Sequence, residues 1–145
     1  MKPNSELIRM LKAHSKFEAN MVNLVANLEE KVHTAAAKLL LAEMRFDSQK
    51  HEGILDEVLN VLEDKPQPEL LWDARIESYV DMQVVKKELE KHMQLESDML
   101  GDVEKEVKET NDEAVKTLLA HIAEDEKKHH KNIELIIKKS YSFSP

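Results

Sequence analysis

Residues 11–28 read LKAHSKFEANMVNLVANL, and this stretch repeats with the period of an α-helix. Leu11, His14, Glu18, Met21 and Val25 follow one another at alternating spacings of three and four residues, so they share one helix face. Comparable stripes recur along the chain, and they predict an all-α protein with helices at about 5–31, 34–63, 80–109 and 112–139. The expected N-terminal caps are Asn4 or Ser5, Thr34, and the segment 110–112.

The connections between these helices predict how they are arranged. The first and third joins are very short, so we expect two antiparallel hairpins. Pro66 and Pro68 end the second helix, and a crossover of about residues 64–79 follows. Two hairpins with a long crossover form the ferritin-like type of four-helix bundle, in one domain of residues 1–145, and an up-down-up-down bundle with a loose linker is the alternative. The crossover is expected to pack on the bundle through its apolar residues Leu70, Leu71, Trp72, Ile76 and Tyr79.

The composition excludes several classes of function. The chain has 145 residues, of which 2 are Gly, 4 are Pro and none is Cys. The lack of cysteine rules out disulfides, thiol nucleophiles and iron–sulfur centres. A net charge of −8 argues against nucleic acid and against anionic membrane surfaces as partners. With no apolar run of membrane-spanning length and no signal-peptide core, we expect a cytoplasmic protein.

An internal repeat relates the two halves of the chain. A shift of 78 residues aligns His14 with His92, Glu18 with Glu96, and His51 with His129, without a gap. Helical proteins share Leu, Ala and Lys by chance, whereas matched His-x-x-x-Glu-x-x-Met and Asp-x-x-Lys-His motifs at one offset are much rarer. The repeat therefore predicts pseudo-symmetric hairpins.

Polar residues interrupt the apolar stripes at one depth of the predicted bundle. A buried carboxylate must be neutralised, pair with a donor or bind a cation. Glu126 and His129 form Glu-x-x-His, which places a carboxylate and an imidazole one turn apart on one helix face. Without thiolates, such ligands suit iron or manganese, and zinc also fits. The candidate ligands are Glu18, His51, Glu96, Glu126 and His129.

On these residues the chain resembles the ferritin-like di-iron carboxylate proteins, particularly short rubrerythrin-like domains, over about residues 5–138. The resemblance implies that the five candidate residues hold the metal. It further implies that Asp47 orients His129 and that Asp125 orients His51.

This sequence departs from the family pattern at Ser48, where a sixth ligand, a glutamate, is expected. Three outcomes stay open: an asymmetric di-metal site, a single metal near Glu126 and His129, or no metal. His14 and His92 are expected to support the glutamates rather than bind metal.

The leading functional hypothesis is a rubrerythrin-like protein that binds iron, in a mono- or dinuclear site, and handles peroxide or oxygen or sequesters iron. As an enzyme it would be a non-haem iron peroxidase or ferroxidase, and peroxidase turnover would need an external electron donor. The family resemblance also favours a homodimer. The alternative is a metal-free bundle that serves as an interaction or dimerisation module.

Overall fold

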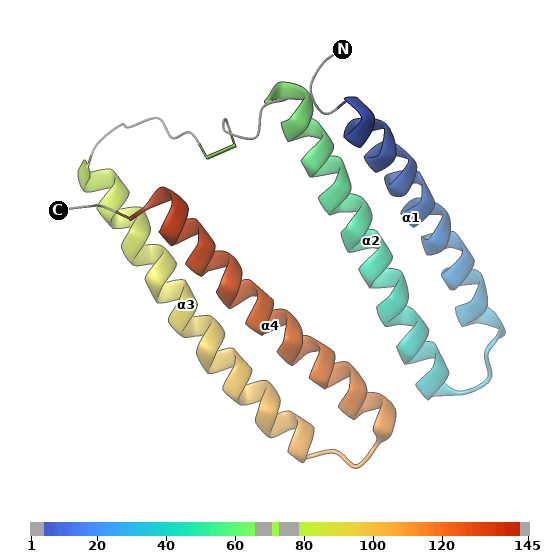
Figure 1. Cartoon of the computed structure of the whole chain (residues 1–145). Helices are drawn as coiled ribbons and strands as arrows, with labels where there is room; N and C mark the ends of the chain where they lie inside the picture. The colour runs from blue at the N-terminus through green and yellow to red at the C-terminus, as the bar shows by residue number, and fades with distance from the viewer. Residues whose placement is uncertain (1–4, 66–70, 73–78, 143–145) are drawn as a thin grey trace. The chain divides into compact units, whose positions relative to one another are not determined.

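The computed structural model describes residues 5–65, 71–72 and 79–142, and they form four α-helices without strands. The helices are α1 (Ser5–Lys31), α2 (Ala35–Asp64), α3 (Tyr79–Lys108) and α4 (Glu113–Ser140) (Figure 1). Each begins and ends within one residue of the range expected from the sequence. The all-α class is confirmed.

Side-chain caps fix the starts of α2 and α4. The hydroxyl of Thr34 accepts a hydrogen bond from the backbone N–H of Ala37 at 3.1 Å. The carboxylate of Asp112 accepts one from Val115 at 2.9 Å. Both caps satisfy a backbone donor that the first helical turn leaves free, which confirms these two predictions. Of the two caps proposed for α1, Asn4 lies outside the described residues, and Ser5 is the first residue of the helix.

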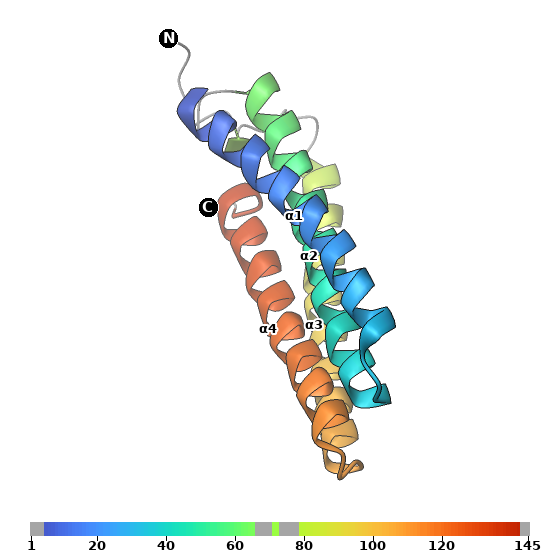
Figure 2. The same ribbon diagram turned by 90° about the vertical axis from the view of Figure 1, so that its right-hand side faces the viewer.

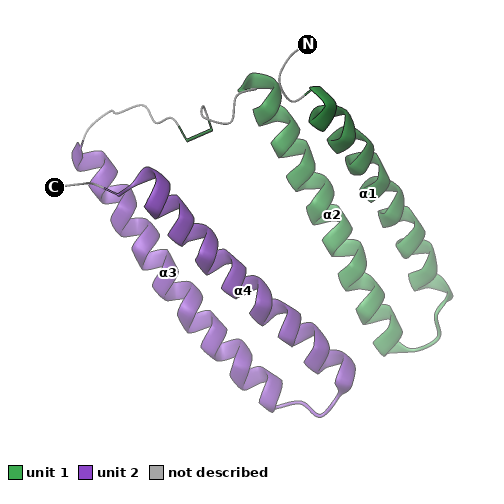
Figure 3. Ribbon diagram, viewed as in Figure 1, with its two compact units in different colours: residues 1–73 green, residues 74–145 purple. Residues whose placement is uncertain are grey.

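The chain divides into two compact units, Met1–Asp73 (unit 1) and Ala74–Pro145 (unit 2) (Figure 3). Unit 1 contains α1 packed along α2, and unit 2 contains α3 packed along α4; two views show both pairs side by side (Figures 1 and 2). Their buried apolar residues include Val25 and Val103, which the 78-residue repeat relates. The other buried apolar residues are Leu59 and Leu62 on α2 and Ala114 and Ile133 on α4.

Polar contacts link α1 to α2 along one flank of unit 1. Arg45 donates two hydrogen bonds to Glu29, from Nε at 2.7 Å and from Nη2 at 3.3 Å. This hydrogen bonding raises the pKa of Arg45 above its ordinary value. Ser15 donates to Asp56 at 2.7 Å in the same unit. Lys12 Nζ also lies 3.5 Å from Glu63 Oε1.

The opposite flank of each unit carries exposed apolar side chains. In α1 they recur at the spacing of one helical face. In α3 Leu95 takes the place of Phe17, whereas Glu88, Asp102 and Glu106 stand at the positions equivalent to Met10, Leu24 and Leu28. Exposed apolar residues at the spacing of one helical face indicate a face that packs against another surface. The exposed apolar residues of these flanks are Met10, Phe17, Leu24, Leu28, Leu40, Met44 and Val58 in unit 1, and Val85, Leu95, Met99, Ile122 and Ile136 in unit 2.

Only the residues Leu71, Trp72 and Tyr79 of the predicted apolar crossover contacts are described; Leu70 and Ile76 lie outside the described residues. Leu71 lines an apolar groove of about 230 Å³ together with Val58, Val61 and Leu62 of α2. Leu71, a described residue of the crossover, therefore lies against α2. Within the described residues, none of the helices has the length and apolar character that crossing a membrane requires.

Candidate metal centre

Three of the predicted ligands lie together in unit 2. Glu96 of α3 and Glu126 and His129 of α4 each offer one ligand atom, and these atoms all lie within 4.8 Å of one another. His129 Nδ1 lies 3.8 Å from Glu96 Oε2 and 4.0 Å from Glu126 Oε2. The i, i+3 spacing of Glu126 and His129 accounts for their proximity, and the short α3–α4 connection brings Glu96 to the same depth.

Glu96 is also contacted by a histidine of its own helix, α3. His92 Nε2 and Glu96 Oε1 are hydrogen-bonded at 3.1 Å, one turn apart on α3. The second oxygen of Glu96, Oε2, is buried and has no hydrogen-bond partner. This oxygen is the one nearest His129, so the Glu96 carboxylate has an oxygen without a hydrogen bond on the side of the other two candidate ligands.

Unit 1 contains a related cluster around Glu18, which is only 8 % exposed. His14 Nε2 lies 3.3 Å from Glu18 Oε1, and His51 Nδ1 lies 3.5 Å from Glu18 Oε2. Like its counterpart in unit 2, Glu18 Oε2 is buried without a hydrogen-bond partner. His14 and His92 thus occupy equivalent places beside the two glutamates, as the repeat predicts.

The two clusters differ at one position. Ser48 stands where unit 2 has Glu126. Among the described residues, Glu96, Glu126 and His129 form the one group of three convergent metal-type ligands. Glu18 and His51 are brought together in unit 1, with His14 on the other oxygen of Glu18, but in the part of the chain that the structure describes these residues do not form a group of three ligand atoms within 4.8 Å of one another.

The predicted supporting aspartates have lysine neighbours on their own helices. Asp47 Oδ1 lies 3.9 Å from Lys50 Nζ, and Asp125 Oδ1 lies 3.8 Å from Lys128 Nζ. The expected contacts of Asp47 with His129 and of Asp125 with His51 would join the two units. Those contacts, like a single site built from all five ligands, remain predictions.

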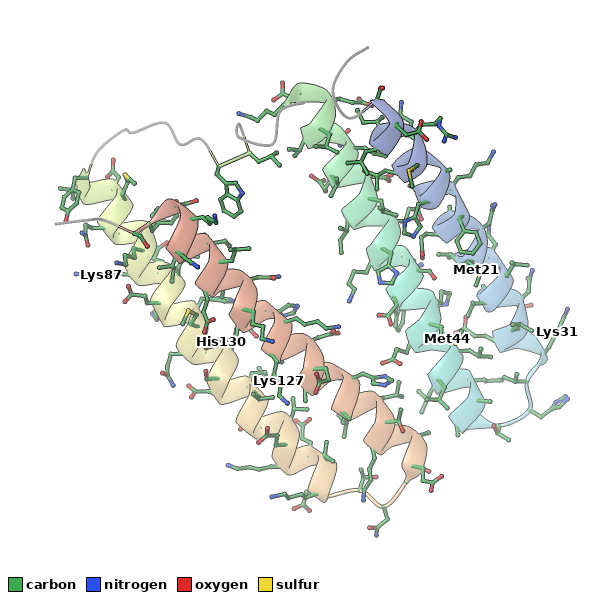
Figure 4. The ribbon with its side chains drawn as sticks, in the orientation of Figure 1. Met21, Lys31, Met44, Lys87, Lys127 and His130 are labelled. Carbon is green, nitrogen blue, oxygen red and sulfur yellow. The ribbon has the colours of Figure 1, made fainter. Side chains whose placement is uncertain are left out.

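A groove of about 490 Å³ opens beside the two carboxylates of unit 2. Glu96, Ser97 and Leu100 line it from α3, while Lys127 and His130 point into it from α4 (Figure 4). His130 also pairs with Glu134 at 3.2 Å, as their i, i+4 spacing allows. The remaining lining residues are Glu124, Glu126, Lys128, Lys131 and Glu134.

The donor set of unit 2 fits a divalent metal ion. Two carboxylates this close repel each other unless a cation or proton lies between them. The free buried oxygen of Glu96 lacks the partner that a buried carboxylate oxygen needs, and a metal ion supplies one. Carboxylate and imidazole ligands without thiolate suit iron, manganese or zinc.

Comparison of the chain with family models, curated proteins and solved structures gives no match. The case for a ferritin-like relationship accordingly rests on the residues themselves.

Proposed function

We propose that this protein binds a metal ion, with iron as the leading candidate, in a rubrerythrin-like site of carboxylates and imidazoles. The observation that carries the proposal is the convergence of Glu96, Glu126 and His129 around the unpartnered buried oxygen of Glu96. Bound iron would supply redox chemistry toward peroxide or oxygen. The chain would contribute the ligands and an adjoining groove.

We further propose that the two units close into a ferritin-like four-helix bundle through their apolar flanks. Exposed apolar residues lie on the same helical flank as the candidate ligand in both units: Met44 and Val58 accompany His51, and Ile122 and Ile136 accompany His129. Packing these flanks together would bury them and would enclose the half-exposed histidines. The crossover of about residues 64–79 would connect the hairpins.

Metal loading tests the proposed function. Full-length protein would be incubated anaerobically with ferrous iron, desalted, and analysed for iron and protein. We expect retained iron in the wild type and loss of it in Glu126→Gln, because the substitution removes an anionic ligand while preserving the side-chain shape. Glu113→Gln is the matched control, since Glu113 is an exposed residue of the same helix and does not line the groove. Retention of no iron by the wild type, or equal retention by all three proteins, would contradict the proposal.

The exposed apolar flanks support a second candidate, an interaction or dimerisation module without metal. In that case the polar clusters serve only as hydrogen-bonded networks. The melting temperature of the apoprotein would then equal that of protein incubated with iron, manganese or zinc. Bound metal would instead raise it, because a ligand that binds only the folded state stabilises that state.

A further inference from the structure

The two clusters have different ratios of carboxylate to imidazole. In unit 1 one carboxylate, Glu18, lies between His14 and His51. In unit 2 two carboxylates, Glu96 and Glu126, lie beside His129, and Glu96 also contacts His92. Both glutamates of unit 2 have side chains that are mostly buried, with exposures of 14 % and 17 %.

This difference affects what each cluster needs for charge balance. In unit 1 the single carboxylate of Glu18 has an imidazole nitrogen beside each of its oxygens, from His14 and from His51. In unit 2 two mostly buried carboxylates lie close together, and their mutual repulsion disfavours two negative charges without a cation between them. A divalent cation balances both carboxylates at once and accepts the His129 ring nitrogen as a neutral third ligand.

We infer that the chain holds one metal ion, bound by Glu96, Glu126 and His129 of unit 2, and that the His14–Glu18–His51 cluster of unit 1 is a metal-free network of imidazole–carboxylate contacts. This inference rests on the proposed function and specifies which half of the pseudo-symmetric chain carries it. Ser48 is the residue that makes unit 1 different, because a neutral hydroxyl supplies neither the charge nor the strong ligand of Glu126.

The chain offers a matched pair of variants for the test. Glu18→Gln and Glu96→Gln alter glutamates that the repeat relates, each with a histidine one turn earlier and a buried free oxygen. Metal content would be measured on full-length proteins after anaerobic loading with ferrous iron, and binding would be followed by titration. We expect one ion per chain in the wild type and in Glu18→Gln. Loss of a direct ligand in Glu96→Gln is expected to weaken binding by at least about 100-fold, above the range seen for residues that only support ligands.

A gain-of-site variant provides the second arm. Ser48→Glu restores the missing carboxylate, so we expect two ions per chain, whereas the uncharged Ser48→Gln should still hold one. Far-ultraviolet circular dichroism checks that each variant is folded.

The outcomes separate this inference from the proposed function. Two ions in the wild type, equal losses in Glu18→Gln and Glu96→Gln, or a single ion in folded Ser48→Glu would each overturn the one-metal assignment while leaving metal binding intact. A wild type that binds none would overturn both.

Discussion

Units 1 and 2 share a helical framework but use their polar residues differently. Unit 1 ties its helices together with Arg45 and Glu29, whereas the equivalent positions in unit 2 are Ala123 and Val107. Unit 2 has Glu126 where unit 1 has Ser48. The two units match at the buried Val25 and Val103 and at their His–Glu pairs, whereas other polar positions differ and supply an interhelical contact in unit 1 and a metal-type ligand in unit 2.

The shared core gives the largest expected effect on stability. Val25 is 2 % exposed and Val103 is 4 % exposed, at equivalent positions. Val25→Ala and Val103→Ala each remove buried methyl groups, so each should lower the free energy of unfolding by about 2–3 kcal/mol. Urea denaturation measures the loss, with the exposed Val84→Ala as the control. A large loss for only one of the buried valines would show that the two cores are not equivalent.

The second prediction compares the helix caps of the two units. Thr34→Ala and Asp112→Ala each leave a backbone N–H of the first turn without its side-chain partner, at Ala37 and Val115 respectively. Each substitution should cost about 1 kcal/mol of unfolding free energy in denaturant titrations. Thr34→Ser retains the hydroxyl and should be close to neutral. If the alanine variants were equally neutral, the caps would not contribute to stability as described.

The third prediction concerns the Arg45–Glu29 contact of unit 1, whose equivalent positions in unit 2 are Ala123 and Val107. Arg45→Met keeps much of the aliphatic stem and removes the hydrogen bonds to Glu29, along with the guanidinium that lies 4.7 Å from the ring centre of Phe46. We expect a lower melting temperature than that of the wild type, by less than for Val25→Ala. Lys38→Met, an exposed substitution on the same helix, is the control. An unchanged melting temperature in Arg45→Met would show that the Arg45–Glu29 contact does not stabilise unit 1.

The smallest effect is expected at the start of α1. The hydrogen bond from Arg9 lowers the pKa of Glu6 below its ordinary value of 4.5, and Glu6 is fully exposed. A lowered folded-state pKa means that the pair contributes stability above the unfolded-state pKa and loses it as the pH falls through the folded-state pKa. Carbon NMR titration of the Glu6 carboxyl should show the lowered pKa in the wild type and its return toward the ordinary value in Arg9→Met. An identical titration in both proteins would exclude the pairing.

The helices and caps were predictable from the sequence because their determinants are local. Periodic apolar residues fix each helix, and Thr34 and Asp112 act on residues three positions away. The unit 2 ligands were predictable for the same reason: Glu126 and His129 are neighbours on one helix turn, and the short α3–α4 connection sets the depth of Glu96.

Contacts that depend on side-chain reach or on the packing of distant segments were less predictable. The Arg45–Glu29 pair joins two helices through long side chains, and periodicity does not specify such a partner. Whether Glu18 and His51 approach the unit 2 ligands depends on how the two hairpins pack. A pattern within one helix does not determine that packing, and the proposal for it rests on the apolar flanks.

The most direct test of the account is to locate the metal. Crystals of the full-length protein loaded with ferrous iron under anaerobic conditions would be measured at the iron absorption edge, where anomalous scattering reveals the position of each ion. We expect one anomalous peak per chain, from an iron ion coordinated by Glu96, Glu126 and His129. A peak at Glu18 and His51 without one at these three residues, or no peak in iron-loaded crystals, would contradict it.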